Sequence, residues 1–201
     1  STTVLADRYN GKRFNSPNDV VVKSDGSIWF TDPAYGIESN YEGYKAEPEI
    51  GGDHVYRLDP ATGECRIVAD DFKRPNGLAF SLDEKQLYIA DSGGTHFSTG
   101  EMHIRVFDVS EDGRLSGGEV FATCTSGIFD GFRLDDRGRI WAGVTEGVHC
   151  LNQDGEVIGK IYLPERASNV CFGGQKRNRL FITASSSVYS VLLPTDGPKL
   201  F

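Results

Sequence analysis

The sequence predicts an all-β protein of the β-propeller class, and three observations lead to this expectation. The first is a repeat of short apolar runs and polar turns, whose units begin at Asn18, Asn76, Asp130 and Asn169. The second is the spacing of these units, 58, 54 and 39 residues, which is close to the length of a propeller blade. The third is that no window shows helical periodicity over three turns.

Each unit starts with a polar head and continues with an apolar strand, a polar turn and a second strand. The four segments are NDVVVKSDGSIWFTD, NGLAFSLDEKQLYIADS, DGFRLDDRGRIWAGV and NVCFGGQKRNRLFITAS. Two more strand-like runs follow the first three units, over 54–72, 102–123 and 147–164, and residues 187–201 are the candidates for the fourth. Four antiparallel strands joined by Asp-Gly or Gly-rich turns make one blade.

Four blades are therefore expected, and residues 1–9 read as the outer strand of an earlier blade. We expect a single β-propeller domain over 1–201 that lacks about two N-terminal blades. In a propeller each blade covers the apolar face of its neighbour, so an open arc of four would leave apolar faces exposed.

The composition argues against some classes of binding partner. The net charge of −8 argues against nucleic acid, because phosphate binding needs a surface of Lys and Arg. The acidic balance is explained either by a solvated surface or by attraction of cations. No apolar run approaches the ~20 residues of a membrane helix, so no membrane partner is expected. The four cysteines are scattered without metal-type spacing, and we interpret them as reduced thiols of a cytoplasmic protein, with the periplasm as the alternative.

The repeat also predicts a functional site. The first strand of each blade lines the central channel, so the polar heads should converge at one of its mouths. Amide and carboxylate oxygens suit a hard divalent cation, and the candidate ligands are Asn18, Asn76 and Asp130. The alternative for each is a cap of the strand start. Asn169 is expected at the matching position of the last blade, without contacting the metal.

Two further carboxylates, Asp32 and Asp91, end the second strands of the first two blades. We interpret them as turn caps rather than metal ligands. Tyr35 follows in TDPAYG, and its aromatic ring is explained either by core packing or by a role at the site.

The segments RFNSPNDVVVKSDGSIWFTDPAYG, RPNGLAFSLDEKQLYIADSG, FDGFRLDDRGRIWAG and SNVCFGGQKRNRLFITA resemble the SMP-30/gluconolactonase/LRE family. This resemblance covers essentially the whole chain. It implies a six-bladed propeller with a divalent metal in the central channel, held by an N-terminal Glu, by Asn side chains and by an Asp. Asn76 and Asp130 match such ligands, and Asn18 matches a residue that binds metal in some members and water or substrate in others. The Glu has no counterpart in this chain.

The resemblance also implies an activity, the hydrolysis of a sugar lactone such as gluconolactone to the aldonic acid. The metal would polarise the carbonyl, and Asp130 would be both ligand and general base. Ca²⁺ is the first choice of metal, with Zn²⁺ and Mg²⁺ as alternatives. Substrate contacts are expected from Arg13, Asn15, Asn18 and Tyr35, the last by stacking on a sugar ring.

Two other functions stay open. The chain could belong to a hydrolase of other lactones or of phosphoesters on the same architecture. It could also be a binding module without catalysis, because a propeller fold does not determine function. The sequence carries no indication of the oligomeric state.

Overall fold

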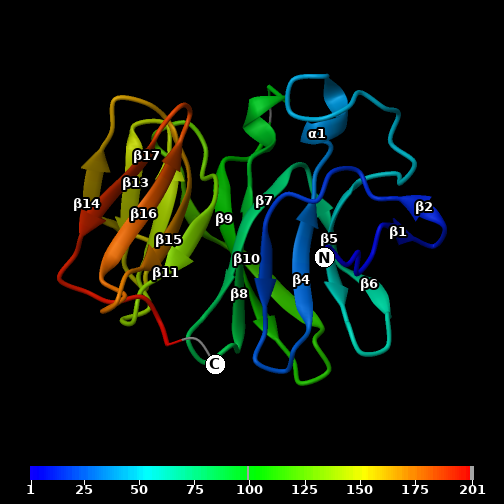
Figure 1. Cartoon of the computed structure of the whole chain (residues 1–201), viewed down its shortest axis with the longest axis horizontal. Coiled ribbons are helices and arrows are strands. Elements are labelled where there is room, and N and C mark those ends of the chain that lie inside the picture. The colour runs from blue at the N-terminus through cyan, green and yellow to red at the C-terminus, as the bar shows by residue number, and fades with distance from the viewer. Residues whose placement is uncertain (99, 200–201) are drawn as a thin grey trace.

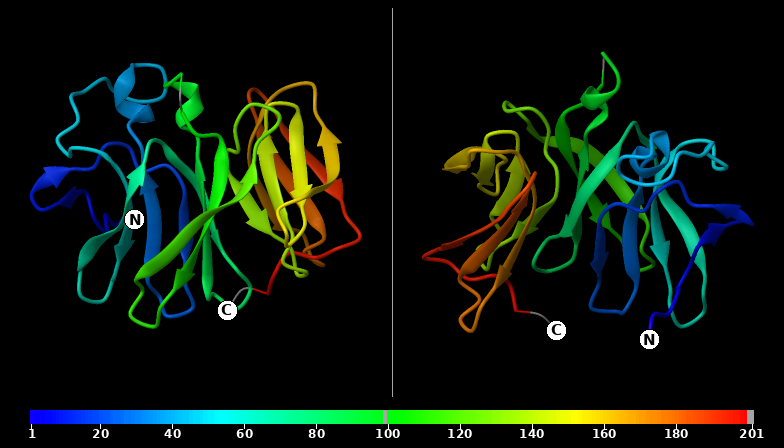
Figure 2. Two further views of the ribbon diagram at one scale, coloured as in Figure 1. Left: turned by 180° about the vertical axis from the view of Figure 1, so that it is seen from behind. Right: turned by 45° about the horizontal axis from the view of Figure 1, so that its top comes forward.

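The computed structural model describes residues 1–98 and 100–199, and it is built almost entirely of short antiparallel strands. Four sheets stand side by side in chain order and form an arc of propeller blades (Figures 1 and 2). The expected all-β propeller with four blades is confirmed. No helix in the described part of the chain is long and apolar enough to cross a membrane.

Each blade is one sheet whose strands follow one another in sequence. Blade 1 holds β3 (Val20–Val22), β4 (Ile28–Asp32), β5 (Asp53–Leu58) and β6 (Cys65–Phe72); blade 2 holds β7 (Pro75–Phe80), β8 (Gln86–Asp91), β9 (His103–Val109) and β10 (Leu115–Thr123); blade 3 holds β11 (Phe132–Leu134), β12 (Ile140–Val144), β13 (Gly147–Leu151) and β14 (Val157–Tyr162); blade 4 holds β15 (Ala167–Gly173), β16 (Arg179–Ala184) and β17 (Val188–Leu192).

The first strands of the blades are neighbours, since β7 contacts β3 and β11, and β11 contacts β15. The core lies between the blades rather than within them. One apolar cluster joins blades 1 and 2 around Trp29, a second joins blades 2 and 3 around Phe132, and a third joins blades 3 and 4 around Trp141. A blade therefore depends on its neighbours to bury its apolar faces.

Burial along the strands follows from this stacking. Every residue of β12 and β13 in blade 3 is buried, because blades 2 and 4 cover both faces. In β16 of blade 4 only one face is covered, so Leu180 and Ile182 are buried while Phe181 is exposed. Period-2 alternation of this kind is expected where a sheet has one open face.

The opening segment differs from the expectation. Residues 1–9 do not form the outer strand of a blade; β1 (Arg8–Tyr9) pairs instead with β2 (Lys12–Arg13) in a small hairpin. Its turn is Asn10-Gly11, with φ of 50° and 80°. An Asn-Gly pair with both φ positive is the preferred two-residue hairpin turn, and this local preference explains the correction. Ala6 and Tyr9 then pack on the outer face of blade 1.

Two excursions stand over one end of the channel. The long connection from β4 to β5 carries α1 (Tyr35–Glu38), and the connection from β8 to β9 carries the 3₁₀ turn η1 (Gly93–Thr95). They lie beside each other at the top of Figure 1, at the end where the heads of the first strands lie.

Gly77 is required where the first strands of blades 2 and 3 meet. A Cβ at this position would lie 2.4 Å from the carbonyl oxygen of Asp130 and 3.0 Å from Cα of Gly131. We expect Gly77→Ala to lower the free energy of unfolding by about 1–3 kcal/mol, because rigid backbone must move. Urea denaturation measures this. Gly51→Ala is the matched control, since nothing lies within 4 Å of its Cβ position; equal losses in both variants would contradict the prediction.

Candidate metal and active site

The structure brings together two of the predicted ligands, Asn76 and Asp130. Asn76 lies near the start of β7 and is only 3% exposed. Its carbonyl oxygen accepts a hydrogen bond of 2.8 Å from Oγ1 of Thr31. Asp130 precedes β11 and is half-buried, and its backbone N–H donates to the carbonyl of Gly143 over 2.9 Å. The two residues belong to neighbouring first strands, so their side chains share one mouth of the channel.

The carboxyl group of Asp130 is electrostatically unusual. Burial raises its pKa to about 6, although a hydrogen bond from the Asn76 side chain and the charge of Arg166 act in the opposite direction. The nearby carboxylate of Asp19 raises it slightly further. A buried carboxylate of this kind is stabilised by a bound cation, which replaces the lost hydration.

The side chain of Asn76 fits a cation ligand. Its amide nitrogen Nδ2 donates to Oγ of Ser92 over 3.2 Å, whereas its oxygen Oδ1 is buried without a hydrogen-bond partner. An unsatisfied buried oxygen calls for an explanation, and a bound ion is one. Within residues 1–98 and 100–199 no group of three or more His, Cys, Asp or Glu side chains could hold a metal. Asn76 and Asp130 therefore fit an oxygen-liganded cation whose remaining ligands come from elsewhere.

The other two heads are placed differently. The side chain of Asn18 is exposed, and the residue lines a pocket with Leu5 of the opening segment. Asn169 is not at the position that the repeat suggested. It pairs with Thr183 across the blade, and its Oδ1 accepts from N–H of the next residue over 2.8 Å, as Asp19 does in blade 1. Asn169 thus stands one residue farther along its strand than Asn76 and Asp130, at the position of Gly77 and Gly131, and Ser168 is the residue that matches the two candidate ligands.

Asp32 and Asp91 are turn caps, as expected. Asp32 accepts hydrogen bonds of 2.9 and 2.8 Å from the backbone N–H groups of Asn15 and Ser16. In blade 2, Asp91 accepts equivalent hydrogen bonds of 3.0 and 2.9 Å from the backbone N–H groups of Lys73 and Arg74. Burial nevertheless raises the pKa of Asp32 to about 6, against the effect of these two bonds. Both caps hold the segment that leads into the first strand of their blade.

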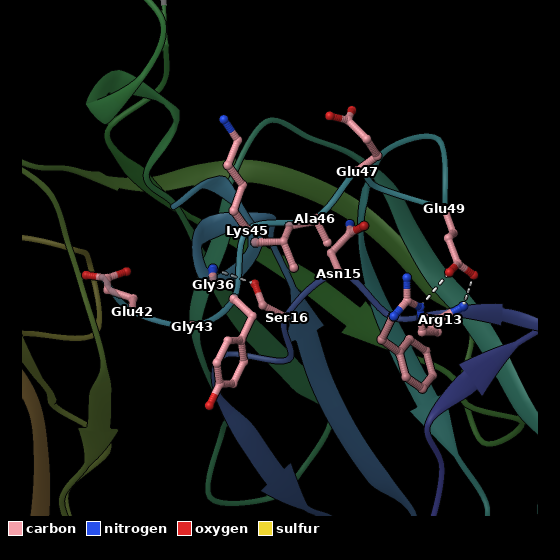
Figure 3. Close-up of a pocket in the computed structure, with 13 residues that line it drawn as sticks. Arg13, Asn15, Ser16, Gly36, Glu42, Gly43, Lys45, Ala46, Glu47 and Glu49 are labelled. Carbon is pink, nitrogen blue, oxygen red and sulfur yellow. Dashed lines mark hydrogen bonds and ion pairs between the residues drawn. The ribbon is translucent and has the colours of Figure 1, made fainter. Parts of the chain in front are cut away.

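Arg13 and Asn15 line a pocket of about 470 Å³ with residues 42–49, and neither Asn76 nor Asp130 borders it. Figure 3 shows Arg13 turned toward Glu49, to which its Nε donates over 2.5 Å. The amide nitrogen of Asn15 donates to the carbonyl oxygens of Asp32 and Gly52 over 3.2 and 3.0 Å. The structure thus gives both predicted substrate contacts partners within the protein.

Tyr35 lies on the rim between the two excursions. Its ring covers the guanidinium of Arg74 at 5.6 Å and lies 5.4 Å from the ring of His96. Its hydroxyl hydrogen-bonds with Oγ1 of Thr95 over 3.2 Å. Burial raises the pKa of the phenol to about 12, so it stays protonated at neutral pH. Tyr35 therefore packs against Arg74, His96 and Thr95, and its stacking on a sugar stays a prediction.

A network of charges holds the same rim. Arg74 donates to the carboxylates of Glu38 and Asp53, and the second oxygen of Glu38 lies 2.8 Å from Nε2 of His96. These contacts connect the α1 excursion to the η1 turn.

Sequence reasoning missed two features of the site. The first is an ion pair inside the channel, in which both Nη atoms of Arg133 donate to the carboxylate of Asp19 over 2.9 and 3.0 Å. The second is Ser92, whose side chain contacts Asn76. The repeat does not mark the ion pair, because the equivalent positions in the other blades carry different residues. Ser92 has a counterpart in Ser185 of blade 4, but this shared serine does not by itself indicate a contact with Asn76. Polar residues at inward positions of the first strands, such as Asp19 and Arg133, were the available signal for the ion pair.

The sequence profile described as the SMP-30/Gluconolactonase/LRE-like region matches residues 1–186. The chain belongs to this family. Among the relatives of this SMP-30/gluconolactonase/LRE-like chain is the gluconolactonase of Zymomonas mobilis subsp. mobilis, 35% identical over 97% of this chain and 55% of the relative. A lactonohydrolase of Aspergillus oryzae is 30% identical over 88% of this chain and 41% of its own length.

A solved structure agrees with this family assignment. A gluconolactonase from Xanthomonas campestris superposes with a TM-score of 0.86 at 41% identity, over 95% of this chain and 61% of that one. The chain spans about half the length of the curated relatives that it matches.

Proposed function

We propose that this chain is part of a cation-dependent hydrolase that opens a sugar lactone, gluconolactone or a close analogue, to the aldonic acid. The observation that carries the proposal is that Asn76, whose Oδ1 is buried without a hydrogen-bond partner, lies beside Asp130, whose carboxyl group has a pKa raised by burial to about 6. Relatives described as a gluconolactonase and a lactonohydrolase support the substrate class.

We propose Asn76 and Asp130 as cation ligands and Asn18 as a third. Oxygen donors of this kind favour Ca²⁺, which takes about six to eight oxygens, with Mg²⁺ and Zn²⁺ as alternatives. The two described ligands leave most of such a shell to water, substrate or other groups. When bound, the ion would supply Lewis-acid polarisation of the lactone carbonyl.

Asp130 would act as the general base. Its carboxylate takes a proton from the attacking water while the water oxygen bonds to the carbonyl carbon. The ring C–O bond then breaks, and the proton passes from Asp130 to the released alkoxide, which gives a hydroxy acid. A bound dication would lower the pKa of Asp130 from the value of about 6 that burial gives it, and coordination through one oxygen would leave the other oxygen free to take the proton.

We propose that sugar hydroxyls are held by exposed polar groups around the mouth. Asn18 and Tyr35 are the candidates on the rim. Arg13 and Asn15 remain predicted contacts only for a substrate large enough to reach their pocket. A cytoplasmic location, proposed from the cysteines, fits the four free thiols of the structure.

The test is isothermal titration of Ca²⁺, Mg²⁺ and Zn²⁺ into metal-stripped protein, followed by hydrolysis assays of gluconolactone with the preferred ion. We expect saturable binding of one ion and turnover that disappears with chelator. Ion binding without turnover of any lactone would replace the enzyme with a binding module. No ion binding by folded protein would contradict the cation site.

A further inference from the structure

Ser92 carries a fully buried hydroxyl at the candidate site. It follows β8 directly and is 0% exposed. Its Oγ lies 2.8 Å from the carbonyl oxygen of Phe129, the residue before Asp130, and 3.2 Å from Nδ2 of Asn76. A single hydroxyl therefore connects the Asn76 side chain to the backbone that precedes Asp130, across the boundary between blades 2 and 3.

The directions of these hydrogen bonds follow from elementary chemistry. A backbone carbonyl oxygen can only accept, so the single hydroxyl proton of Ser92 must point at Phe129. Towards Asn76 the same Oγ then has only lone pairs to offer. The amide of Asn76 satisfies it by presenting Nδ2, since the reversed amide would place two acceptors against each other. The hydrogen bond to Ser92 therefore identifies the amide atom beside it as the nitrogen.

The consequence concerns the other end of the amide. Nδ2 is held by Ser92, and the side chain also donates a hydrogen bond to the Asp130 carboxyl, so Oδ1 is the end of the amide that is buried without a hydrogen-bond partner. We propose that Ser92 is a positioning residue that orients the Asn76 amide so that its oxygen is presented to the channel cation. This inference rests on the proposed function, because it assigns a role towards the same ion.

The experiment is a double-mutant cycle on Ca²⁺ affinity, measured by titration of metal-stripped protein. Ser92→Ala removes the acceptor for Nδ2, so we expect roughly 10- to 100-fold weaker binding, the usual effect of losing a partner that orients a ligand. Asn76→Asp places an oxygen at both ends of the side chain, so its orientation no longer matters. In the Asn76→Asp background, Ser92→Ala should therefore change the affinity less than about threefold.

The matched control is Ser27→Ala. Ser27 is 2% exposed, and its Oγ accepts a hydrogen bond of 2.9 Å from Nε1 of Trp29, so it is another buried hydroxyl with an N–H donor, in the turn between β3 and β4. We expect it to lower the melting temperature without changing the Ca²⁺ affinity. A second measurement needs no variant: in cation-free protein the side-chain N–H₂ of Asn76 should exchange slowly with solvent by NMR.

The outcomes are distinguishable. Wild-type protein that binds no cation overturns the proposed function, and this inference with it. Wild-type binding with unchanged affinity in Ser92→Ala overturns the role of Ser92 alone. An equal loss in the wild-type and Asn76→Asp backgrounds also overturns it, because the effect would then not depend on amide orientation. Fast exchange of the Asn76 amide contradicts the hydrogen bond itself.

Discussion

Replacing Asp130 with Asn is expected to reduce lactone hydrolysis by about 10²–10⁴-fold and to abolish detectable Ca²⁺ binding. The amide cannot accept the proton of water, and it removes the negative charge that balances a dication. The first effect slows the chemical step and the second weakens ion binding. We therefore expect kcat to fall, and added Ca²⁺ should not restore it. Steady-state assays at several Ca²⁺ concentrations measure the first effect, and calorimetric titration measures the second.

The same variant should be more stable than the wild type when no cation is present. The folded pKa of Asp130 is about 6, above its unfolded value of 3.8, so the folded state binds more protons between these pH values. The free energy of unfolding therefore falls as pH rises from about 4 to 6, and the cost stays in place above that range. Asp130→Asn removes a cost of about 1–3 kcal/mol at pH 7.

Urea denaturation of chelated protein at pH 4.5 and pH 7 tests this gain. The control is Asp154→Asn, an exposed turn residue of the same blade, which should change neither activity nor stability. An Asp130→Asn protein that retains more than about a tenth of wild-type kcat would exclude this residue as the base. A variant less stable than the wild type at pH 7 would show that its carboxylate is not destabilised by burial.

Replacing Arg133 with Met is expected to cause the largest loss of stability, about 3–5 kcal/mol. Asp19 is only 6% exposed, and its carboxylate also accepts hydrogen bonds from the backbone N–H groups of Val20 and Leu78 over 2.8 and 3.4 Å. It thereby connects the first strands of three blades, with Arg133 as its charged partner. Removal of the guanidinium leaves a buried carboxylate without compensation, which is far more costly than the loss of an exposed ion pair.

The double variant Asp19→Asn with Arg133→Met should recover most of this loss, because no unpaired charge remains and the amide oxygen still accepts from backbone. Arg114→Met is the control, since Arg114 pairs with Asp112 at 2.8 Å with 79% of its side chain exposed, where an ion pair contributes about 0–1 kcal/mol. Urea denaturation of the wild type, the two single variants and the double variant measures these changes in the free energy of unfolding. Equal losses in Arg133→Met and Arg114→Met, or no recovery in the double variant, would contradict the proposed role of the buried pair.

Local sequence sufficed where the structure repeats. The strands that follow Asn18, Asn76 and Asp130 were predicted because the same alternation of strand and turn recurs in the consecutive residues of each blade. The proximity of the two candidate ligands Asn76 and Asp130 was also predictable, since equivalent positions of neighbouring blades lie side by side. The repeat failed at Asn169, because this asparagine stands one residue later in its strand than Asn76 and Asp130, at the position of Gly77 and Gly131. It failed again at residues 1–9, where the Asn10-Gly11 turn forms a separate hairpin.

The sequence by itself determined the class of fold, the order of the blades and the residues whose oxygens could hold a cation. Only the tertiary structure decided how these residues are supported. Asp19 and Arg133 are 114 residues apart, and Ser92 is 37 residues from Phe129. No periodicity connects such positions, because their contacts arise from the stacking of whole blades. Burial also affects the chemistry of the site: desolvation raises the pKa of Asp130, and the single hydroxyl proton of Ser92 determines which end of the Asn76 amide faces Ser92.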